Sequence, residues 1–312
     1  MKKLIALVLS LLAVASLVAG CSSGKGTTVN SGEKSVTFSL LSSPASLDPA
    51  TTTDGHSLMV ETQLFSMLVE SKGGTSSEIK PDIAESWEIS EDGLTYTFKL
   101  RDDVYFHNGK LLTADDVVYT FNRVMTEPYT SYYAAPIKSV EATDEHTFVA
   151  HLNYPFADFL TLIGGIYFGI CCEEAITAGS DFMYKPVGTG PYKLEGGYIP
   201  GQAFKFVYND QYYGAEPDIK EINFKIQPDT NTAVISLQNG EVDFIPALTV
   251  NDIGTIENDE NLALYQAPSY TIHYVCFNKN NAPWNIKEVR QAINYAINKQ
   301  DLLDGALNGI GT

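Results

Sequence analysis

The chain has 312 residues, 44% of them hydrophobic, which is enough for about two domains with substantial cores. It carries 38 acidic and 20 basic side chains, a formal net charge of −18, without any basic run interleaved with aromatics. This charge argues against a nucleic-acid-binding protein, because such proteins present clustered lysine and arginine to phosphates. An acidic surface suits a soluble extracytoplasmic protein but does not identify a ligand.

The first 20 residues are laid out as a secretory signal peptide. Lys2 and Lys3 form a basic start, an apolar run over 4–18 follows, and small residues close the segment. A transmembrane anchor is the alternative, but this run is shorter than the ~20 residues that cross a bilayer. We therefore expect residues 1–20 to be removed during secretion.

Residues 18–21, Val-Ala-Gly-Cys, are similar to the lipobox of bacterial lipoproteins. In that class the cysteine receives a diacylglyceryl group and becomes the mature N-terminus. The similarity implies that Cys21 is lipidated and that its acyl chains anchor the protein without a spanning helix. Residues 21–35 carry the lipidated cysteine and then a run rich in Gly, Ser and Thr, which predicts a flexible tether.

The folded part is predicted to open with a strand and a helix. Val36, Phe38 and Leu40 alternate with more polar residues, as in a strand with one buried face. From His56 to Leu68 the apolar residues recur at helical spacing, which predicts one helix over this range.

The stretch 81–125 predicts two hairpins that lead into a capped helix. Apolar and polar residues alternate on both sides of the turn Glu91-Asp92-Gly93. His107-Asn108-Gly109 supplies a second turn. Thr113 and Asp116 have the spacing of a capping box, with Asp in place of Glu, just before a helical pattern.

The later elements are predicted from the two-residue alternation typical of strands, from the spacing typical of helices and from turn residues. Hairpins dominate between 70 and 160, whereas strands and helices alternate after 188, which predicts an α/β lobe interrupted by a β-rich insertion. The predicted strands cover 147–152, 204–208, 222–226, 242–245 and 270–278, and the predicted helices cover 156–163, 230–239 and 286–298.

The run over 85–117 resembles the hallmark segment of the extracytoplasmic solute-binding proteins of family 5, which serve peptide and nickel ABC transporters. Asn108 stands where family members usually have Asp, a mild departure within a turn. Further matching pieces occur in the expected order at 46–49, 188–192, 239–243 and 288–297. The resemblance covers residues 36–312.

This resemblance implies an α/β, bilobal fold of the periplasmic-binding-protein type II class, with a discontinuous first lobe and an inserted β-rich domain. Family members continue well beyond the predicted helix at 286–298, so we expect a C-terminally truncated chain with only the start of a third domain. The expected segments are a signal peptide at 1–20, a lipidated tether at 21–35, the first lobe at 36–71 and 187–267, the insertion at 72–186 and the third domain from 268 to 312.

The sequence contains no recognisable catalytic or metal-binding motif. It has no Gly-x-Ser-x-Gly elbow, and Gly188-Thr189-Gly190 continues into Pro-Tyr rather than into a lysine-bearing phosphate loop. The five histidines show no close metal-ligand spacing; they are His56, His107, His146, His151 and His273. These observations favour a binding protein without cofactor or metal over an enzyme.

Three cysteines remain if Cys21 is lipidated, and an odd number argues against a disulfide framework. Cys171 and Cys172 follow an apolar run, so we expect both to be small packed residues rather than a redox pair. Cys276 lies in the predicted strand 270–278 and is expected to be packed as well.

The resemblance also implies where a ligand lies. A loop after Asp48-Pro49, a tyrosine pair in the insertion and a strand that crosses between lobes are expected to line the cleft. The expected ligand contacts are Thr53, Asp54, Gly55, Tyr132, Tyr133, Tyr270, His273 and Tyr274.

By resemblance, the expected function is capture of short peptides by closure of two lobes and delivery to the permease subunits of an ABC importer. Closure is expected about crossovers near 186–188 and 268–270, in a monomer anchored by lipid to the outer face of the bacterial cell membrane or in the periplasm. The alternatives are a binding protein for a nickel chelate, haem or an oligosaccharide, and a surface receptor for peptide signals that feeds no transporter.

Overall fold

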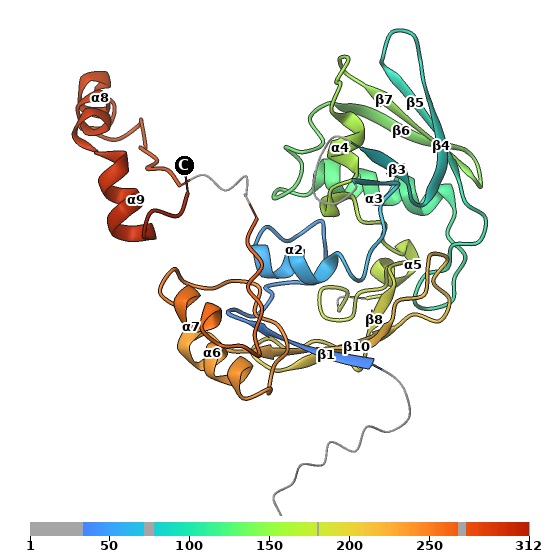
Figure 1. The fold of residues 1–312 in the computed structure, drawn as a ribbon. Coiled ribbons are helices and arrows are strands. Elements are labelled where there is room, and N and C mark those ends of the chain that lie inside the picture. Colours follow the sequence, from blue (N-terminus) through green and yellow to red (C-terminus); the bar gives the residue numbers. More distant parts are fainter. Residues whose placement is uncertain (1–33, 72–77, 180, 268–272, 312) are drawn as a thin grey trace, which may run out of the picture. The chain divides into compact units, whose positions relative to one another are not determined.

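The computed structural model describes residues 34–71, 78–179, 181–267 and 273–311 (Figure 1). The expected signal peptide, Cys21 and most of the tether lie outside the described residues, as does Tyr270. From Ser35 onward the chain forms one unit with two hydrophobic cores. It is a mixed α/β fold, as the sequence predicts.

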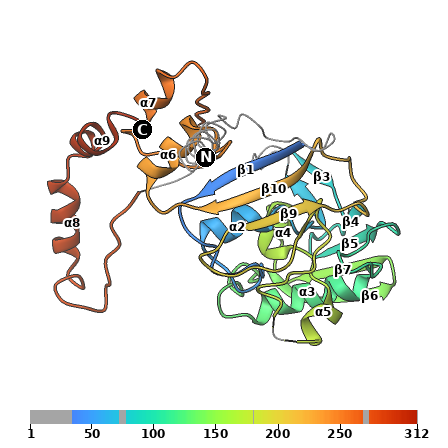
Figure 2. The same ribbon diagram turned by 90° about the horizontal axis from the view of Figure 1, so that it is seen from below.

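The first sheet has the order β1-β10-β9-β8 (Figure 2). Its strands are β1 (Lys34–Leu40), β8 (Tyr192–Leu194), β9 (Phe204–Tyr208) and β10 (Ile219–Ile226). The pairs β8–β9 and β9–β10 are antiparallel. Phe204 and Phe224 stack with ring centroids 4.6 Å apart and fill the core beneath this sheet.

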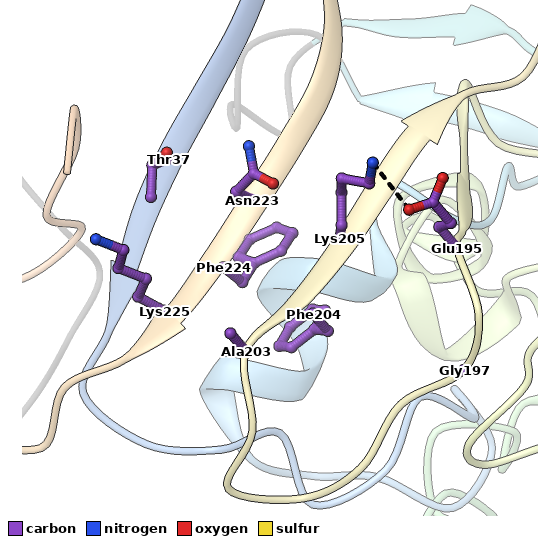
Figure 3. Close-up of a pocket in the computed structure, with 9 residues that line it drawn as sticks. All are labelled: Thr37, Glu195, Gly197, Ala203, Phe204, Lys205, Asn223, Phe224 and Lys225. Carbon is purple, nitrogen blue, oxygen red and sulfur yellow. Dashed lines mark ion pairs between the residues drawn. The ribbon is translucent and has the colours of Figure 1, made fainter. Parts of the chain in front are cut away.

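An open hollow of about 460 Å³ lies over this sheet (Figure 3). Its two cationic side chains already have partners: Lys205 pairs with Glu195 at 2.8 Å, and Lys225 donates to the Glu241 carbonyl at 2.9 Å. The hollow contains none of the expected ligand contacts. We therefore do not place a binding site there.

The second sheet has the order β4-β5-β7-β6. Its strands are β4 (Ala84–Ile89), β5 (Thr95–Leu100), β6 (Ile137–Asp144) and β7 (Thr147–Leu152), and a separate ribbon pairs β2 (Val69–Ser71) with β3 (Ile79–Pro81). Trp87 lies opposite Phe98 in the β4–β5 hairpin. Gly93 has φ +68°, which the turn requires and which glycine adopts without strain. This hairpin confirms the alternation predicted around Glu91-Asp92-Gly93.

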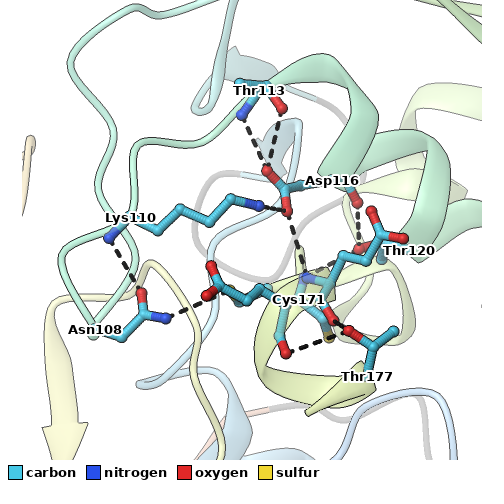
Figure 4. A network of polar contacts seen from close by, with 10 residues as sticks. Asn108, Lys110, Thr113, Asp116, Thr120, Cys171 and Thr177 are labelled. Carbon is cyan, nitrogen blue, oxygen red and sulfur yellow. Dashed lines mark hydrogen bonds and ion pairs between the residues drawn. The ribbon is translucent and has the colours of Figure 1, made fainter.

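Helix α3 (Ala114–Thr126) packs against β6 and β7 and begins with the predicted capping box. Val117, Phe121 and Val124 are fully buried. Asp116 does more than cap the helix, because its carboxylate also accepts from Lys110 Nζ at 2.6 Å and from the Glu173 amide at 3.3 Å (Figure 4). The cap therefore also holds the start of α5 (Glu173–Thr177).

The two cores meet between neighbouring cysteines. Cys171 packs in the core beneath the first sheet and Cys172 in the core beneath the second. Both are buried and free, which confirms the expectation that they are packed residues. The domain boundaries expected from the family remain predictions.

A second connection between the cores forms at Gly188 and Gly190. The amide of His107 donates to the Gly188 carbonyl at 2.9 Å, and the imidazole contacts the Gly188 amide and the Gly190 carbonyl. The Gly190 amide donates to the Leu64 carbonyl at 2.9 Å. The turn at 107–109 and the segment 188–190 are thus fixed to one another.

Several predicted elements differ from the structure. The helix expected over 56–68 is shorter: α2 spans Gly55–Glu61, and tight turns then lead into β2, because contacts of Leu64 with the 188–190 backbone replace a further helical turn. The strand expected at 242–245 is only a single parallel bridge between Phe38 and Phe244.

Other corrections concern helix bounds and the C-terminal part. Helix α4 spans Phe159–Ile163 and so begins later than expected, after a turn in which the Phe159 amide donates to the Phe156 carbonyl at 3.1 Å. In the described part of the strand expected over 270–278, residues 273–278 pair with no other strand, and Cys276 is exposed rather than packed.

The remaining helices mainly follow the sequence pattern. α6 is capped by Asp229 as expected, and α8 confirms the amphipathic helix predicted at 286–298. No residue of α8 or α9 is buried within the described structure. The remaining helices are the 3-10 helix η2 (Ile166–Phe168) and the α-helices α6 (Thr230–Gln238), α7 (Ile253–Glu257), α8 (Lys287–Ala296) and α9 (Lys299–Leu307).

Gly188→Ala is expected to be strongly destabilising. A Cβ at this position would lie 2.1 Å from the Leu64 carbonyl oxygen, so the two cores would have to separate locally. We expect the free energy of unfolding to fall by about 2 kcal/mol or more, measured by urea denaturation. Gly254→Ala, in α7 with nothing within 4 Å of its Cβ, is the control and should leave stability unchanged or raise it by up to about 1 kcal/mol. Equal effects of both substitutions would contradict this account.

Candidate functional site

The loop over 45–57 is held by its own polar side chains. Ser57 Oγ accepts from the amides of Ala45 at 2.9 Å and Ser46 at 3.4 Å. Asp54 caps α2 by accepting from the Ser57 amide at 2.9 Å, and also accepts from the hydroxyl of Thr52. The loop is therefore defined locally, as expected for an N-cap preceded by a turn.

The electrostatic state of Asp54 follows from these contacts. Burial raises the pKa of Asp54, but hydrogen bonds from Ser57 and Thr52 outweigh burial and leave the pKa below its ordinary value. Asp54 is therefore ionised at neutral pH. Its partners in the described structure are hydroxyls and amides rather than a cation.

A buried ion pair joins this loop to α3. Arg123 donates through Nη1 to Asp48 Oδ1 at 3.0 Å and through Nη2 to Asp48 Oδ2 at 2.7 Å. The two side chains are only 15% and 7% exposed. This bidentate geometry gives the strongest type of protein ion pair and fixes the orientation of both groups.

A further bond brings the segment after α3 to the same loop. Thr130 Oγ1 donates to the Ala50 carbonyl at 3.0 Å, and Thr130 is fully buried. This bond joins the loop, at Ala50, to the segment that carries Tyr132 and Tyr133. Within the loop, Thr53 and Gly55 are exposed and Asp54 is half-buried.

Three tyrosines form a stack on this segment. The ring centroids of Tyr132 and Tyr133 are 4.0 Å apart, and those of Tyr133 and Tyr167 are 4.2 Å apart with nearly parallel planes. Tyr132 is 61% exposed, whereas Tyr133 and Tyr167 are half-buried. Tyr132 is therefore an aromatic surface held in place by two further rings.

No interaction in the described structure brings the expected ligand contacts of the C-terminal part to the 45–57 loop. His273 and Tyr274 are exposed, Tyr274 by 79%, and lie in a segment without strand pairing. Their role as ligand contacts, like that of the other five described residues, remains a prediction.

Glu61, at the end of α2, was not anticipated from the sequence. It is fully buried, and neither carboxyl oxygen has a hydrogen-bond partner among the described residues. Burial, and then the charges of Asp48 and Asp54, raise its pKa to about 9, so Glu61 is neutral at pH 7. The sequence also did not predict the role of Arg123, because no local pattern marks it as the partner of Asp48.

In the ranges that the structure describes, no three His, Cys, Asp or Glu side chains are grouped so that they could bind a metal ion. None of the described helices has the length and apolar character needed to cross a bilayer.

A family model described as "Bacterial extracellular solute-binding proteins, family 5 Middle" matches residues 78–312. The chain is also 34% identical over 296 residues to heme-binding protein A of Haemophilus influenzae; the match covers 86% of this chain and 54% of the relative.

Solved structures show the same similarity. The ABC transporter-associated periplasmic binding protein DppA from Helicobacter pylori, in complex with the peptide STSA, matches with a TM-score of 0.82 and 29% identity, over 89% of this chain and 59% of that one. NikZ from Campylobacter jejuni, in complex with Ni(L-His), matches with a TM-score of 0.78 and 29% identity, over 88% of this chain and 55% of that one. The chain thus spans little more than half the length of the relatives it matches.

Glu61→Gln is expected to stabilise the protein at neutral pH. Keeping Glu61 protonated at pH 7, against an unfolded pKa of 4.5, costs about 3 kcal/mol that glutamine does not incur. Because the folded pKa lies above the unfolded one, wild-type stability is complete below pH 4.5 and declines as the pH rises toward 9. The variant should therefore match wild type near pH 4 and exceed it by about 3 kcal/mol at pH 7 in urea denaturation.

The control is Glu88→Gln, which changes an exposed carboxylate on β4. It should alter the free energy of unfolding by less than about 0.5 kcal/mol at either pH. A Glu61→Gln variant that is no more stable than wild type at pH 7 would show that Glu61 is ionised and paired in the folded protein.

Proposed function

The chain belongs to the bacterial extracellular solute-binding proteins of family 5, and on this basis we propose that it binds short peptides, oligopeptides or dipeptides, for an ABC importer. One observation carries the proposal. The Asp48–Arg123 pair and the Thr130–Ala50 bond join the 45–57 loop to α3 and to the segment that leads to Tyr132, which supports our proposal that both contribute to one ligand surface.

The chemistry of this surface suits a peptide. Asp54 offers an ionised carboxylate, Thr53 an exposed hydroxyl, and Tyr132 an exposed ring that rests on Tyr133. Peptides present ammonium groups, amides and varied side chains, which such groups bind by charge, hydrogen bonding and stacking. The relative from Helicobacter pylori, solved with the peptide STSA, supports this ligand class.

Binding is proposed to close the protein around the ligand without covalent chemistry. Rotation about the expected crossover at 186–188 is disfavoured, since Gly188 and Gly190 are buried and bonded to His107 and Leu64. The two cores would therefore move together, and the other expected crossover, at 268–270, lies outside the described residues.

The proposed location follows from the signal peptide and the lipobox at 18–21. Secretion and acylation of Cys21 would hold a monomer on the outer face of the cell membrane or in the periplasm, next to the permease subunits that receive the peptide. The name of the Helicobacter pylori relative, an ABC transporter-associated periplasmic binding protein, agrees with this placement.

Haem is the second candidate ligand. The relative from Haemophilus influenzae is named a heme-binding protein, and the stack formed by Tyr132, Tyr133 and Tyr167 would also suit a planar group. Native mass spectrometry of protein purified from its own host, with collisional release of bound species, separates the two. Release of short peptides would support the proposal. Release of haem, with its visible absorption, would replace it, and an empty protein that binds neither added STSA nor added haem would contradict both.

Tyr132→Ala is expected to weaken peptide binding. Loss of a well-supported aromatic contact typically costs about 1–2 kcal/mol, which is about a 5- to 30-fold rise in Kd. Titration calorimetry with the tetrapeptide STSA measures this change. Tyr154→Ala, which removes another exposed tyrosine just after β7, should leave the Kd unchanged. Equal effects of the two substitutions would show that Tyr132 is not part of the binding site.

A further inference from the structure

The stack of Tyr132, Tyr133 and Tyr167 has an order that its distances determine. The ring centroid of Tyr133 lies 4.0 Å from that of Tyr132 and 4.2 Å from that of Tyr167. Two rings so close to a third must lie on its opposite faces, because on one face their carbon atoms would come nearer than the ~3.5 Å of van der Waals contact. Tyr133 is therefore the middle ring, and Tyr132 is one end of the stack.

The end formed by Tyr132 is open. Its side chain is 61% exposed although one face lies against Tyr133, so the exposed surface includes the opposite face. Tyr133 and Tyr167 are half-buried and pack against the core beneath the second sheet. The chain thus presents the face of an aromatic ring at the end of a stack that begins in the core.

Hydrogen bonds hold the segment that carries this ring. The amide of Tyr133 donates to the Thr130 carbonyl at 2.9 Å, which closes a turn around Tyr132. The buried Thr130 side chain donates to the Ala50 carbonyl at 3.0 Å. The ring is therefore positioned before a ligand arrives, and a ligand that stacks on it incurs little cost for ordering it.

A cationic side chain is the alternative occupant, since ammonium and guanidinium groups are attracted to aromatic faces. In the described structure, the cations that lie over rings are each also paired with a carboxylate; they are Arg101, Lys110 and Lys220. The stack, in contrast, is built from rings alone. It therefore favours a further aromatic group, and the experiment distinguishes the two occupants.

We propose that the free face of Tyr132 is a subsite for an aromatic side chain of the ligand. The inference rests on the proposed peptide-binding function and adds a preference to it: peptides that carry phenylalanine, tyrosine or tryptophan. The ligand ring would be the fourth member of the stack. Tyr133 and Tyr167 would act as positioning residues, which support Tyr132 without contacting the ligand.

Stacking can be separated from simple apolar contact by comparing a flat ring with a saturated one. Cyclohexylalanine resembles phenylalanine in size but has no π-system and is at least as apolar, so burial alone gives it equal or tighter binding. An aromatic pair adds to burial a gain of about 2- to 12-fold in Kd. The sign of the difference between the two side chains thus reports the stack.

The test is titration calorimetry of the wild-type chain with Ala-Phe-Ala, Ala-cyclohexylalanine-Ala and Ala-Arg-Ala. We expect Ala-Phe-Ala to bind about 2- to 12-fold more tightly than the cyclohexylalanine peptide. Tyr132→Phe keeps the ring and should keep this ratio. Tyr132→Leu keeps an apolar side chain without a ring and should reduce the ratio to about one or below.

Tyr154→Leu is the matched control, because it removes an exposed tyrosine whose ring meets Phe156 edge-on rather than in a stack. This variant should keep the wild-type ratio. Because Tyr132 is exposed, Tyr132→Leu should also keep the wild-type midpoint of urea denaturation, which shows that a lost preference does not come from unfolding.

The remaining outcomes separate this inference from the function on which it rests. Equal binding of the phenylalanine and cyclohexylalanine peptides by wild type, or an unchanged ratio in Tyr132→Leu, would contradict the aromatic subsite alone. Tighter binding of Ala-Arg-Ala than of Ala-Phe-Ala that disappears in Tyr132→Leu would assign the face to a cation and overturn the proposal. Failure of wild type to bind any of the three tripeptides or STSA would contradict the proposed peptide-binding function, and this inference with it.

Discussion

The candidate site depends on the buried ion pair between Arg123 and Asp48. Its partners are 75 residues apart in sequence, and both are almost inaccessible to water. Loss of either partner would leave a buried charge without compensation, a change that typically costs about 3–5 kcal/mol. Since Asp48 lies in the loop that contains Asp54 and Arg123 lies in α3, the pair holds this loop against α3.

Three neighbouring carboxyl groups are held in different states by their surroundings. Asp48 is paired with Arg123, Asp54 is kept ionised by hydroxyl and amide donors, and Glu61 is kept neutral by burial and by the other two. Among the described residues, the carboxylate of the half-exposed Asp54 thus has hydroxyl and amide partners but no cationic one. Under the proposed function, this arrangement suits a ligand that brings its own positive charge.

Local sequence patterns predicted much of the fold. Elements that depend on contacts between distant residues could not be predicted in this way. The β4–β5 hairpin and the cap of α3 depend on turn residues and spacing, so both could be predicted. The early end of α2 depends on contacts of Leu64 with distant glycines, and residues 273–278 lack a pairing strand despite their composition. The loop with Asp54 came from family resemblance, but Arg123 and Glu61 gain their meaning only from the folded structure.

Under the proposed function, the 45–57 loop and the segment 127–135 form one ligand surface. Hydrogen–deuterium exchange of the wild-type chain, with and without a saturating amount of STSA, tests it most directly. We expect slower exchange of backbone amides in both segments together, with little change in β9 and β10 of the first sheet. Slower exchange in only one segment, or over β9 and β10 instead, would contradict it.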